Sequence, residues 1–335
     1  MSGGALSDVL IEEAAEYLRR RIRRTPVEPS PALSEMVGAP VWLKLEFLQL
    51  TGSFKIRGAY FSLSKLNAVQ KARGVVTCSA GNHGKAVAYA CRQMGISARI
   101  YVPSTVDEAK YQGMLELEAE VVRTEHEGYD ECDEYAQREA AEMGMTFLSP
   151  FDDWNVMAGN GGSLACEVLE QTPNARSFLL PVGGGGLAAG FARYLEEECP
   201  RAYLMACQLA ASPALQLSLH RGQAVTRLPG AETVAGGLEG GLGRRTFSVL
   251  KERVDEVALI EEDDLGPAMQ WMIDHHQYLI EPSAAVTLAA VLCGRIGLPA
   301  QPTVIVLSGR NVALPTLRGL LEAESLESHP VRALI

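Results

Sequence analysis

Short apolar segments of strand length alternate along this chain with longer segments in which apolar residues recur every three or four positions. The strand-like segments are 41–48, 74–79, 97–103, 119–124, 177–182, 202–208 and 303–308. The helical segments are 6–23, 83–94, 129–143, 161–171, 187–198 and 264–277. Such alternation predicts an α/β fold with two open, twisted, mostly parallel sheets that carry helices on both faces.

The length of the chain predicts two domains. It has 335 residues, and one domain commonly takes ~100–200. No internal repeat, low-complexity tract or obvious linker divides the sequence. We therefore expect a small α/β domain, residues 51–148, inserted in a large domain made of residues 1–50 and 149–335. Ligands of open α/β sheets lie beyond the carboxyl ends of the strands, so we expect the active site in the cleft between the domains.

Charge and cysteine content exclude several classes of partner. The net charge of −11 disfavours nucleic acid and anionic membrane surfaces. The one basic run, 19–24, ends a helical segment, where cations are favourable and face solvent. No apolar stretch approaches the ~20 residues of a membrane span. The seven cysteines show neither Cys-x-x-Cys nor zinc-site spacing, and no signal peptide precedes them, which predicts reduced thiols in the cytoplasm.

A glycine-rich segment, PVGGGGLAAG at 181–190, joins a predicted strand to a predicted helix. Four glycines let the backbone approach a ligand closely, and the N–H groups of a helix N-terminus bind phosphate. The segment lacks the Gly-Lys-Ser/Thr ending of a nucleotide-binding loop. A dinucleotide site would need an acidic residue after the next strand, where this chain has Gln208. The pattern favours a smaller phosphate ligand over a nicotinamide cofactor.

A lysine and a polar loop supply the other candidate chemistry. In LTGSFKIRGA, residues 50–59, Lys55 follows an apolar Phe54, and burial there would lower its pKa and make the amine nucleophilic. This stretch alone leaves a surface lysine equally possible. In CSAGNHGKAVAYA, residues 78–90, backbone N–H groups and Asn82 suit a carboxylate ligand. His83 is either a general base or a residue that orients the start of the helix, and we favour the second role.

An activated lysine, an anion-binding loop and a phosphate-binding loop together predict pyridoxal 5'-phosphate as the cofactor. The sequence resembles the fold-type II pyridoxal-phosphate enzymes, specifically the serine/threonine dehydratase and serine racemase group, over roughly residues 10–320. The resemblance implies a tryptophan synthase β-like fold. The segment 236–247 also resembles hydroxyectoine-utilisation dehydratases. The motifs that carry the resemblance, in the family's order, are TGSFKIRGA, SAGNHG, SPFDD, PVGGGGLAAG, EPSAA and LSGRN.

The resemblance assigns a role to each motif residue. Lys55 forms the Schiff base with the cofactor, Phe54 packs beside it, and Asn82 hydrogen-bonds the phenolic oxygen of the ring. Ser308 hydrogen-bonds the pyridine nitrogen, and Gly236 flanks the ring. Phosphate is bound by the backbone of Gly183, Gly184, Gly185, Gly186 and Leu187. The substrate carboxylate is bound by the loop Ser79, Ala80, Gly81, Asn82 and His83.

The reaction implied by the resemblance is dehydration and deamination of a small β-hydroxy amino acid such as L-threonine or L-serine. Lys55 would remove the α-proton, and the products would be a 2-oxo acid and ammonia. Alternative substrates are 3-hydroxyaspartate or a hydroxyectoine-derived compound. Racemisation or β-replacement are alternative reactions, although Ala80 occupies the position where the family's racemases have a serine.

Two further positions bear on metal binding and substrate choice. Several family members bind a divalent cation after the strand that here precedes Ser212 and Ala214. No carboxylate stands there in this chain, so we expect no divalent metal. Arg310 would recognise a second substrate carboxylate if it pointed inward, but we expect it to face solvent. The family's habit predicts a homodimer.

Overall fold

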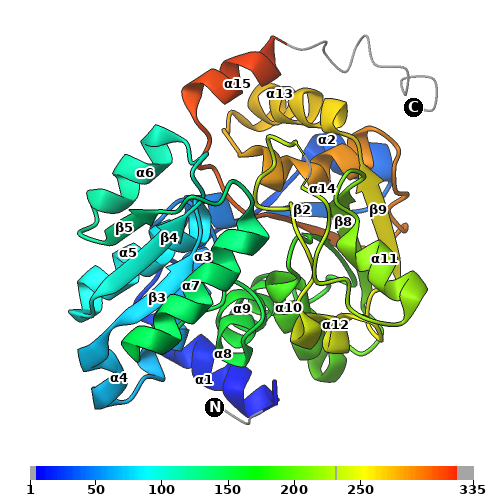
Figure 1. Cartoon of the computed structure of the whole chain (residues 1–335). Helices are drawn as coiled ribbons and strands as arrows, with labels where there is room; N and C mark the ends of the chain where they lie inside the picture. The colour runs from blue at the N-terminus through cyan, green and yellow to red at the C-terminus, as the bar shows by residue number, and fades with distance from the viewer. Residues whose placement is uncertain (1–4, 231, 323–335) are drawn as a thin grey trace.

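The computed structural model describes residues 5–230 and 232–322. It contains two β-sheets that lie side by side, each flanked by helices (Figure 1). The larger sheet has the strand order β1-β2-β10-β7-β8-β9. These strands are β1 (Val27–Pro29), β2 (Val41–Leu45), β10 (Thr303–Leu307), β7 (Ser177–Pro181), β8 (Tyr203–Leu209) and β9 (Glu256–Ile260). Of these described strands, only β1 is antiparallel to its neighbour.

The smaller sheet is entirely parallel and has the order β5-β4-β3-β6. Its strands are β5 (Glu120–Arg123), β4 (Ala98–Val102), β3 (Val75–Cys78) and β6 (Thr146–Phe147). All four come from residues 75–147, whereas the larger sheet combines strands that precede and follow this segment. The α/β architecture with two mostly parallel sheets is thus confirmed.

Helices cover both sheets. The first half of the chain contributes α1 (Asp8–Arg19), α2 (Pro31–Val37), α3 (Lys55–Ser64), α4 (Ala68–Arg73), α5 (Asn82–Met94), α6 (Glu108–Leu115) and α7 (Tyr129–Met143). The second half contributes α8 (Trp154–Met157), α9 (Ser163–Gln171), α10 (Gly186–Glu198), α11 (Ala214–Arg221), α12 (Arg244–Leu250), α13 (Leu265–His276), α14 (Pro282–Leu292) and α15 (Leu314–Leu321). None of these described helices is both long and apolar enough to cross a bilayer.

The central strands of the larger sheet are buried on both faces. Every residue of β7 and β10 is buried, as expected for parallel strands covered by helices on either side. Helix α14 is also buried along its whole length, and it packs with α13 against the sheet. This rigid centre holds the loops that follow β7 and β10, which carry two of the predicted site segments.

A turn of π-helix, η2 (Ala158–Gly162), joins α8 to α9. It packs against both α3 and α10. A Cβ atom on Gly161 would overlap the carbonyl oxygen of Leu187, and one on Gly190 would overlap that of Met157. Glycine at these places therefore permits the close approach of α10 to α8 and the π turn.

Three local expectations are corrected by the structure. The segment 41–48 alternates like one strand, but the strand ends at Leu45, and Glu46–Leu48 form a 3-10 turn, η1. The turn lets Glu46 reach Arg57, which the alternation pattern cannot reveal. The helix expected over 161–171 begins at Ser163, after the π turn. No helix was predicted around Lys55, whereas this lysine is the first residue of helix α3.

Candidate active site

Lys55 is half-buried at the start of α3. Its Nζ donates a 2.9 Å hydrogen bond to the carbonyl of Pro150 and lies 5.3 Å from the centre of the Phe54 ring. Burial lowers the pKa of Lys55 to about 8, and the negative charge of Glu281 opposes part of this shift. Lys55 is therefore not an ordinary surface lysine, and its partly buried amine loses its proton near pH 8.

The turn before Lys55 is joined to the loop after β10. The backbone N–H of Phe54 donates to the carbonyl of Ser308 at 3.1 Å, and Ser53 pairs with Gly309 in an isolated bridge. Ser308 itself is 3% exposed. Two segments some 250 residues apart in the sequence thus meet, and the predicted partner of the pyridine nitrogen lies next to the predicted Schiff-base lysine.

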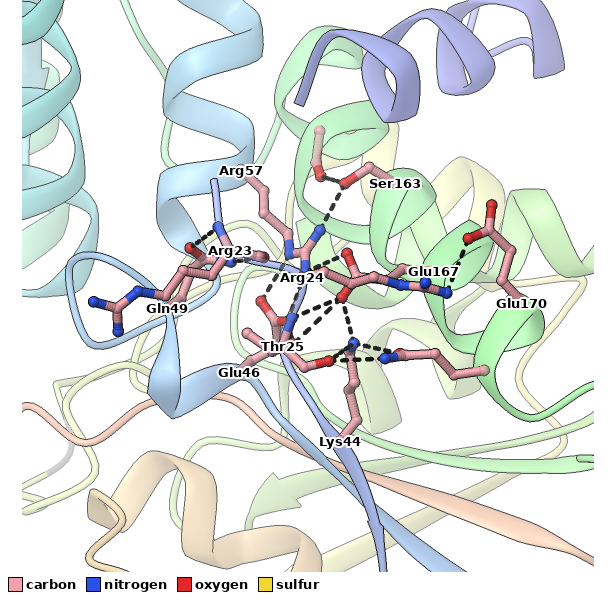
Figure 2. Close-up of polar contacts among 12 residues, drawn as sticks. Arg23, Arg24, Thr25, Lys44, Glu46, Gln49, Arg57, Ser163, Glu167 and Glu170 are labelled. Carbon is pink, nitrogen blue, oxygen red and sulfur yellow. Dashed lines mark hydrogen bonds and ion pairs between the residues drawn. The ribbon is translucent and has the colours of Figure 1, made fainter. Parts of the chain in front are cut away.

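A buried network of charges lies beneath the first turn of α3 (Figure 2). Arg57 donates from Nε and Nη2 to the two carboxylate oxygens of Glu46, both at 2.7 Å. Its Nη2 also reaches Glu167 at 3.1 Å, and Lys44 reaches Glu167 at 2.6 Å. Arg57, Glu46 and Lys44 are at most 1% exposed. Two cations and two carboxylates therefore tie α3 to β2 and α9.

A second contact holds the same turn of the helix. The backbone N–H of Gly58 donates to Oδ1 of Asn160 at 2.8 Å. Asn160 projects from the π turn η2, and a Cβ on Gly58 would lie 2.7 Å from the Asn160 side chain. Isolated π turns are frequent at functional sites, because they redirect a side chain without breaking the helix.

The glycine-rich loop leads directly into α10. Gly185 is the N-cap residue, with φ +91, a conformation that side chains other than glycine rarely adopt. No described side chain caps this helix start, so its first N–H groups are open to an anionic ligand. Phe151 packs against Gly184 and Gly186. Since Pro150 binds Lys55, the segment 149–153 lies between the lysine and this loop.

The loop after β3 carries the five residues predicted to bind a carboxylate. Gly81 is the N-cap of α5, whose start has no side-chain cap among the described residues. Ser79 accepts a 3.2 Å hydrogen bond from the N–H of Gly81, and Ala80 is half-buried. His83 is 3% exposed. Burial and then the charge of Lys55 lower the pKa of His83 to about 3, so the ring is neutral at pH 7 and is a much weaker base than Lys55.

Asn82 is held by two residues to which the sequence assigned no role. Its Nδ2 donates to Oε1 of Glu281 at 2.6 Å, and its Oδ1 accepts from Nδ2 of Asn311, also at 2.6 Å. Burial raises the pKa of Glu281 to about 7, although its hydrogen bonds with Asn311 and Asn82 oppose this. The EPSAA and LSGRN motifs pointed to these segments, but not to this contact.

The structure also places the segment around Gly236, the side chain of Gln208 and that of Arg310. Gly237, next to Gly236, donates from its N–H to Ser283 Oγ at 3.1 Å, and its carbonyl would lie 2.6 Å from a Cβ on Gly183. The segment 236–237 therefore packs against the glycine-rich loop. Gln208 is buried, and its Oε1 accepts two N–H groups from α11. Arg310 is exposed, which agrees with the solvent-facing interpretation.

These groups fit pyridoxal phosphate. An uncapped helix start with Gly185 in the left-handed conformation suits a phosphate. A partly buried lysine with a lowered pKa suits imine formation with an aldehyde. The buried hydroxyls of Thr51 and Ser53, in the turn before that lysine, have no hydrogen-bond partner among the described residues. Polar ligand atoms would satisfy such groups.

Comparisons with known proteins agree with this chemistry. The family model described as pyridoxal-phosphate dependent enzyme matches residues 18–309. An L-threonine ammonia-lyase of Geobacter sulfurreducens is 37% identical over 314 residues, which cover 93% of this chain and 77% of the relative.

Two solved structures share the fold over nearly the full length. The processed form of threonine deaminase isoform 2 from Solanum lycopersicum is 29% identical, with a TM-score of 0.86 and coverage of 96% of this chain and 95% of that one. Maize serine racemase is 31% identical, with a TM-score of 0.86 and coverage of 93% and 96%. The chain therefore belongs to the fold-type II family of pyridoxal-phosphate-dependent enzymes.

Proposed function

We propose that this enzyme catalyses the β-elimination of water from a small β-hydroxy amino acid such as L-threonine or L-serine, which yields a 2-oxo acid and ammonia. The partly buried amine of Lys55 carries the proposal, because a nucleophile that becomes largely neutral above about pH 8 serves both cofactor attachment and proton removal. The similarity to an L-threonine ammonia-lyase and to a threonine deaminase supports the choice of reaction.

Each residue of the site has a proposed task in this reaction. When bound, pyridoxal phosphate supplies an aldehyde that forms an imine with amines and a ring that withdraws electrons from the α-carbon. Lys55 takes the α-proton, since His83, with its low pKa, is the weaker of the two nearby bases. The N–H groups of Ser79, Ala80, Gly81, Asn82 and His83 bind the substrate carboxylate. The ring is held by Phe54, Asn82, Gly236 and Ser308, and the phosphate by Gly183, Gly184, Gly185, Gly186 and Leu187.

Ser308 and Ala80 favour elimination over other fates. A hydroxyl beside the pyridine nitrogen does not force its protonation as a carboxylate would, so the ring is a weaker electron sink. Loss of the β-hydroxyl then competes well with other reactions. Ala80 offers no hydroxyl to act as a second acid or base on the opposite face, which disfavours racemisation.

A substrate panel tests the proposal. Purified enzyme saturated with pyridoxal phosphate is incubated with L-serine, L-threonine and L-threo-3-hydroxyaspartate, and 2-oxo acid and ammonia are measured. We expect both products in equal amounts from L-threonine or L-serine. Chiral analysis of the remaining amino acid distinguishes the racemase alternative, and D-enantiomer without 2-oxo acid would refute elimination as the main reaction.

The lowered pKa of Lys55 predicts how cofactor attachment depends on pH. Only the neutral amine attacks the aldehyde, and Lys55 is largely neutral above about pH 8. The rate at which cofactor-free protein gains its visible absorption after addition of pyridoxal phosphate should rise with pH and level off above about pH 8. Nα-acetyl-lysine serves as the control, and its rate of reaction with pyridoxal phosphate should continue to rise up to a pH of ~10.4, the pKa of an ordinary lysine side chain. Identical profiles would contradict an activated Lys55.

We also propose how the chain is divided into domains, how many copies associate and in which compartment the protein works. We propose a small domain of residues 51–148 inserted in a large domain of residues 1–50 and 149–335, and a cytoplasmic homodimer. The division follows the two sheets, whose strands come from separate stretches of the chain. The seven cysteines, all within the described residues, form no disulfide, which suits a reducing compartment. Light scattering on the protein as it elutes from a size-exclusion column measures the oligomeric state.

A further inference from the structure

Glu281, Asn82 and Asn311 form a closed ring of hydrogen bonds beside the predicted cofactor site. Asn82 Nδ2 donates to Glu281 Oε1 at 2.6 Å, and the backbone N–H of Asn311 donates to Glu281 Oε2 at 2.9 Å. Asn311 Nδ2 closes the ring by donating to Asn82 Oδ1 at 2.6 Å. Glu281 is 5% exposed. The ring joins the segments after β3 and β10 to the start of α14.

The amide of Asn311 has only one possible orientation. Its Nδ2 lies 2.8 Å from the carbonyl oxygen of Thr51, which can only accept a hydrogen bond. Its Oδ1 lies 3.0 Å from the ammonium of Lys85, which can only donate. Exchange of the amide oxygen and nitrogen would place donor against donor and acceptor against acceptor. Asn311 must therefore present a donor to Asn82.

The orientation of Asn82 follows from that of Asn311. Its Oδ1 must face Asn311 Nδ2, which leaves Nδ2 to face the carboxylate of Glu281. One hydrogen of Nδ2 is used in this bond. Among the described residues, no other acceptor for Nδ2 lies within hydrogen-bonding distance. The second N–H is therefore held in a fixed direction and is available to a ligand.

We propose that Glu281 and Asn311, supported by Lys85, are positioning residues that fix which end of the Asn82 amide is the donor and aim its free N–H at the phenolic oxygen of the cofactor. The inference rests on the proposed function, which assigns Asn82 to that oxygen. Space is tight around the ring, because a Cβ on Gly309 would lie 2.5 Å from Glu281 Oε1. The carboxylate has little room to turn away and release Asn82.

Glu281→Gln tests this polarity with a change of one acceptor to a donor. If the oxygen of the substituted amide faces the N–H of Asn311, its nitrogen opposes Asn82 Nδ2. The reverse orientation places two donors together at Asn311. Asn82 must rotate or lose a partner in the first case, and the ring is broken at Asn311 in the second. Asn311→Asp tests the other end, because it replaces the donor to Asn82 Oδ1 with an acceptor.

The readouts are the visible spectrum and the dissociation constant of the cofactor, measured by spectral titration without substrate at about pH 8, where Glu281, with a pKa of about 7, is mostly ionised. In each variant we expect the ~410–430 nm band to shift or lose intensity and the cofactor to bind roughly 10- to 100-fold more weakly, as expected for one lost hydrogen bond to a charged group. Glu256→Gln is the matched control, since Glu256, in β9, accepts a 3.1 Å bond from Tyr203. It should leave both quantities unchanged.

Combination with Asn82→Ala distinguishes positioning from general structural damage. If Glu281 acts through Asn82, the Glu281→Gln change should weaken cofactor binding by less than about twofold in the Asn82→Ala background. An undiminished loss in that background overturns the inference, as does a wild-type spectrum in both single variants. Absence of any visible band in the wild-type protein would instead refute the proposed function. If Glu281→Gln does not fold, Asn311→Asp with and without Asn82→Ala decides the question.

Discussion

Lys55→Ala is expected to abolish turnover of every β-hydroxy amino acid and to remove the visible absorption band of the cofactor-saturated protein at ~410–430 nm. The partly buried amine is the nucleophile proposed for imine formation, and it is also the proposed base for the α-proton. Loss of a general base alone costs ~10²–10⁴-fold in rate. Loss of the covalent attachment comes in addition, so we expect activity below ~10⁻³ of wild type.

Two further variants separate chemistry from charge and from folding. Lys55→Arg keeps the positive charge but should be equally inactive, because a guanidinium neither deprotonates nor forms the imine. Lys65→Ala is the matched control at the C-terminal end of the same helix, where the lysine pairs with Glu13 at the surface. It should retain wild-type rates. Wild-type turnover by Lys55→Ala would rule out the role assigned to this residue.

The sequence predicted the central strands, whose pattern is set by burial, but not the buried helices α3 and α14. Central strands such as β7 and β10 are continuous apolar runs because helices cover both faces. The strands β1 and β6 were missed because they have three and two residues, too few to establish a period. β9 was also missed, because the apolar residues 257–260 form too short a run to distinguish a strand from part of a helix.

The candidate site was predictable where one short motif carries the chemistry. Lys55, Ser308 and the glycine-rich loop each follow a turn or strand end that the sequence marks with small residues. Glu281 and Asn160 were not predicted as partners, because their contacts join segments about 100 to 200 residues apart. Their residue types alone are equally compatible with surface positions.

Arg57→Met is expected to destabilise the fold by about 3–5 kcal/mol, because it leaves a buried carboxylate without its partner. Glu46 is fully buried, and although burial raises its pKa, the charge and hydrogen bonds of Arg57 outweigh this and keep the pKa below its ordinary value. Figure 2 draws two buried cations, Arg57 and Lys44. Without Arg57, the two carboxylates of the network have only Lys44 as a buried cationic partner among the residues drawn. Urea unfolding of the cofactor-free protein at pH 7 measures the change.

The cause of this loss is charge imbalance, and the double variant Glu46→Gln with Arg57→Met isolates it. Removal of one charge of each sign leaves the pair Lys44 and Glu167 balanced, so the double variant should be more stable than Arg57→Met alone. Arg24→Met is the control: its ion pair with Glu170 is 57% and 46% exposed, and such surface pairs contribute at most about 1 kcal/mol. A double variant that loses the sum of the two single effects would show that packing, rather than unpaired charge, dominates at this site, because independent losses are additive.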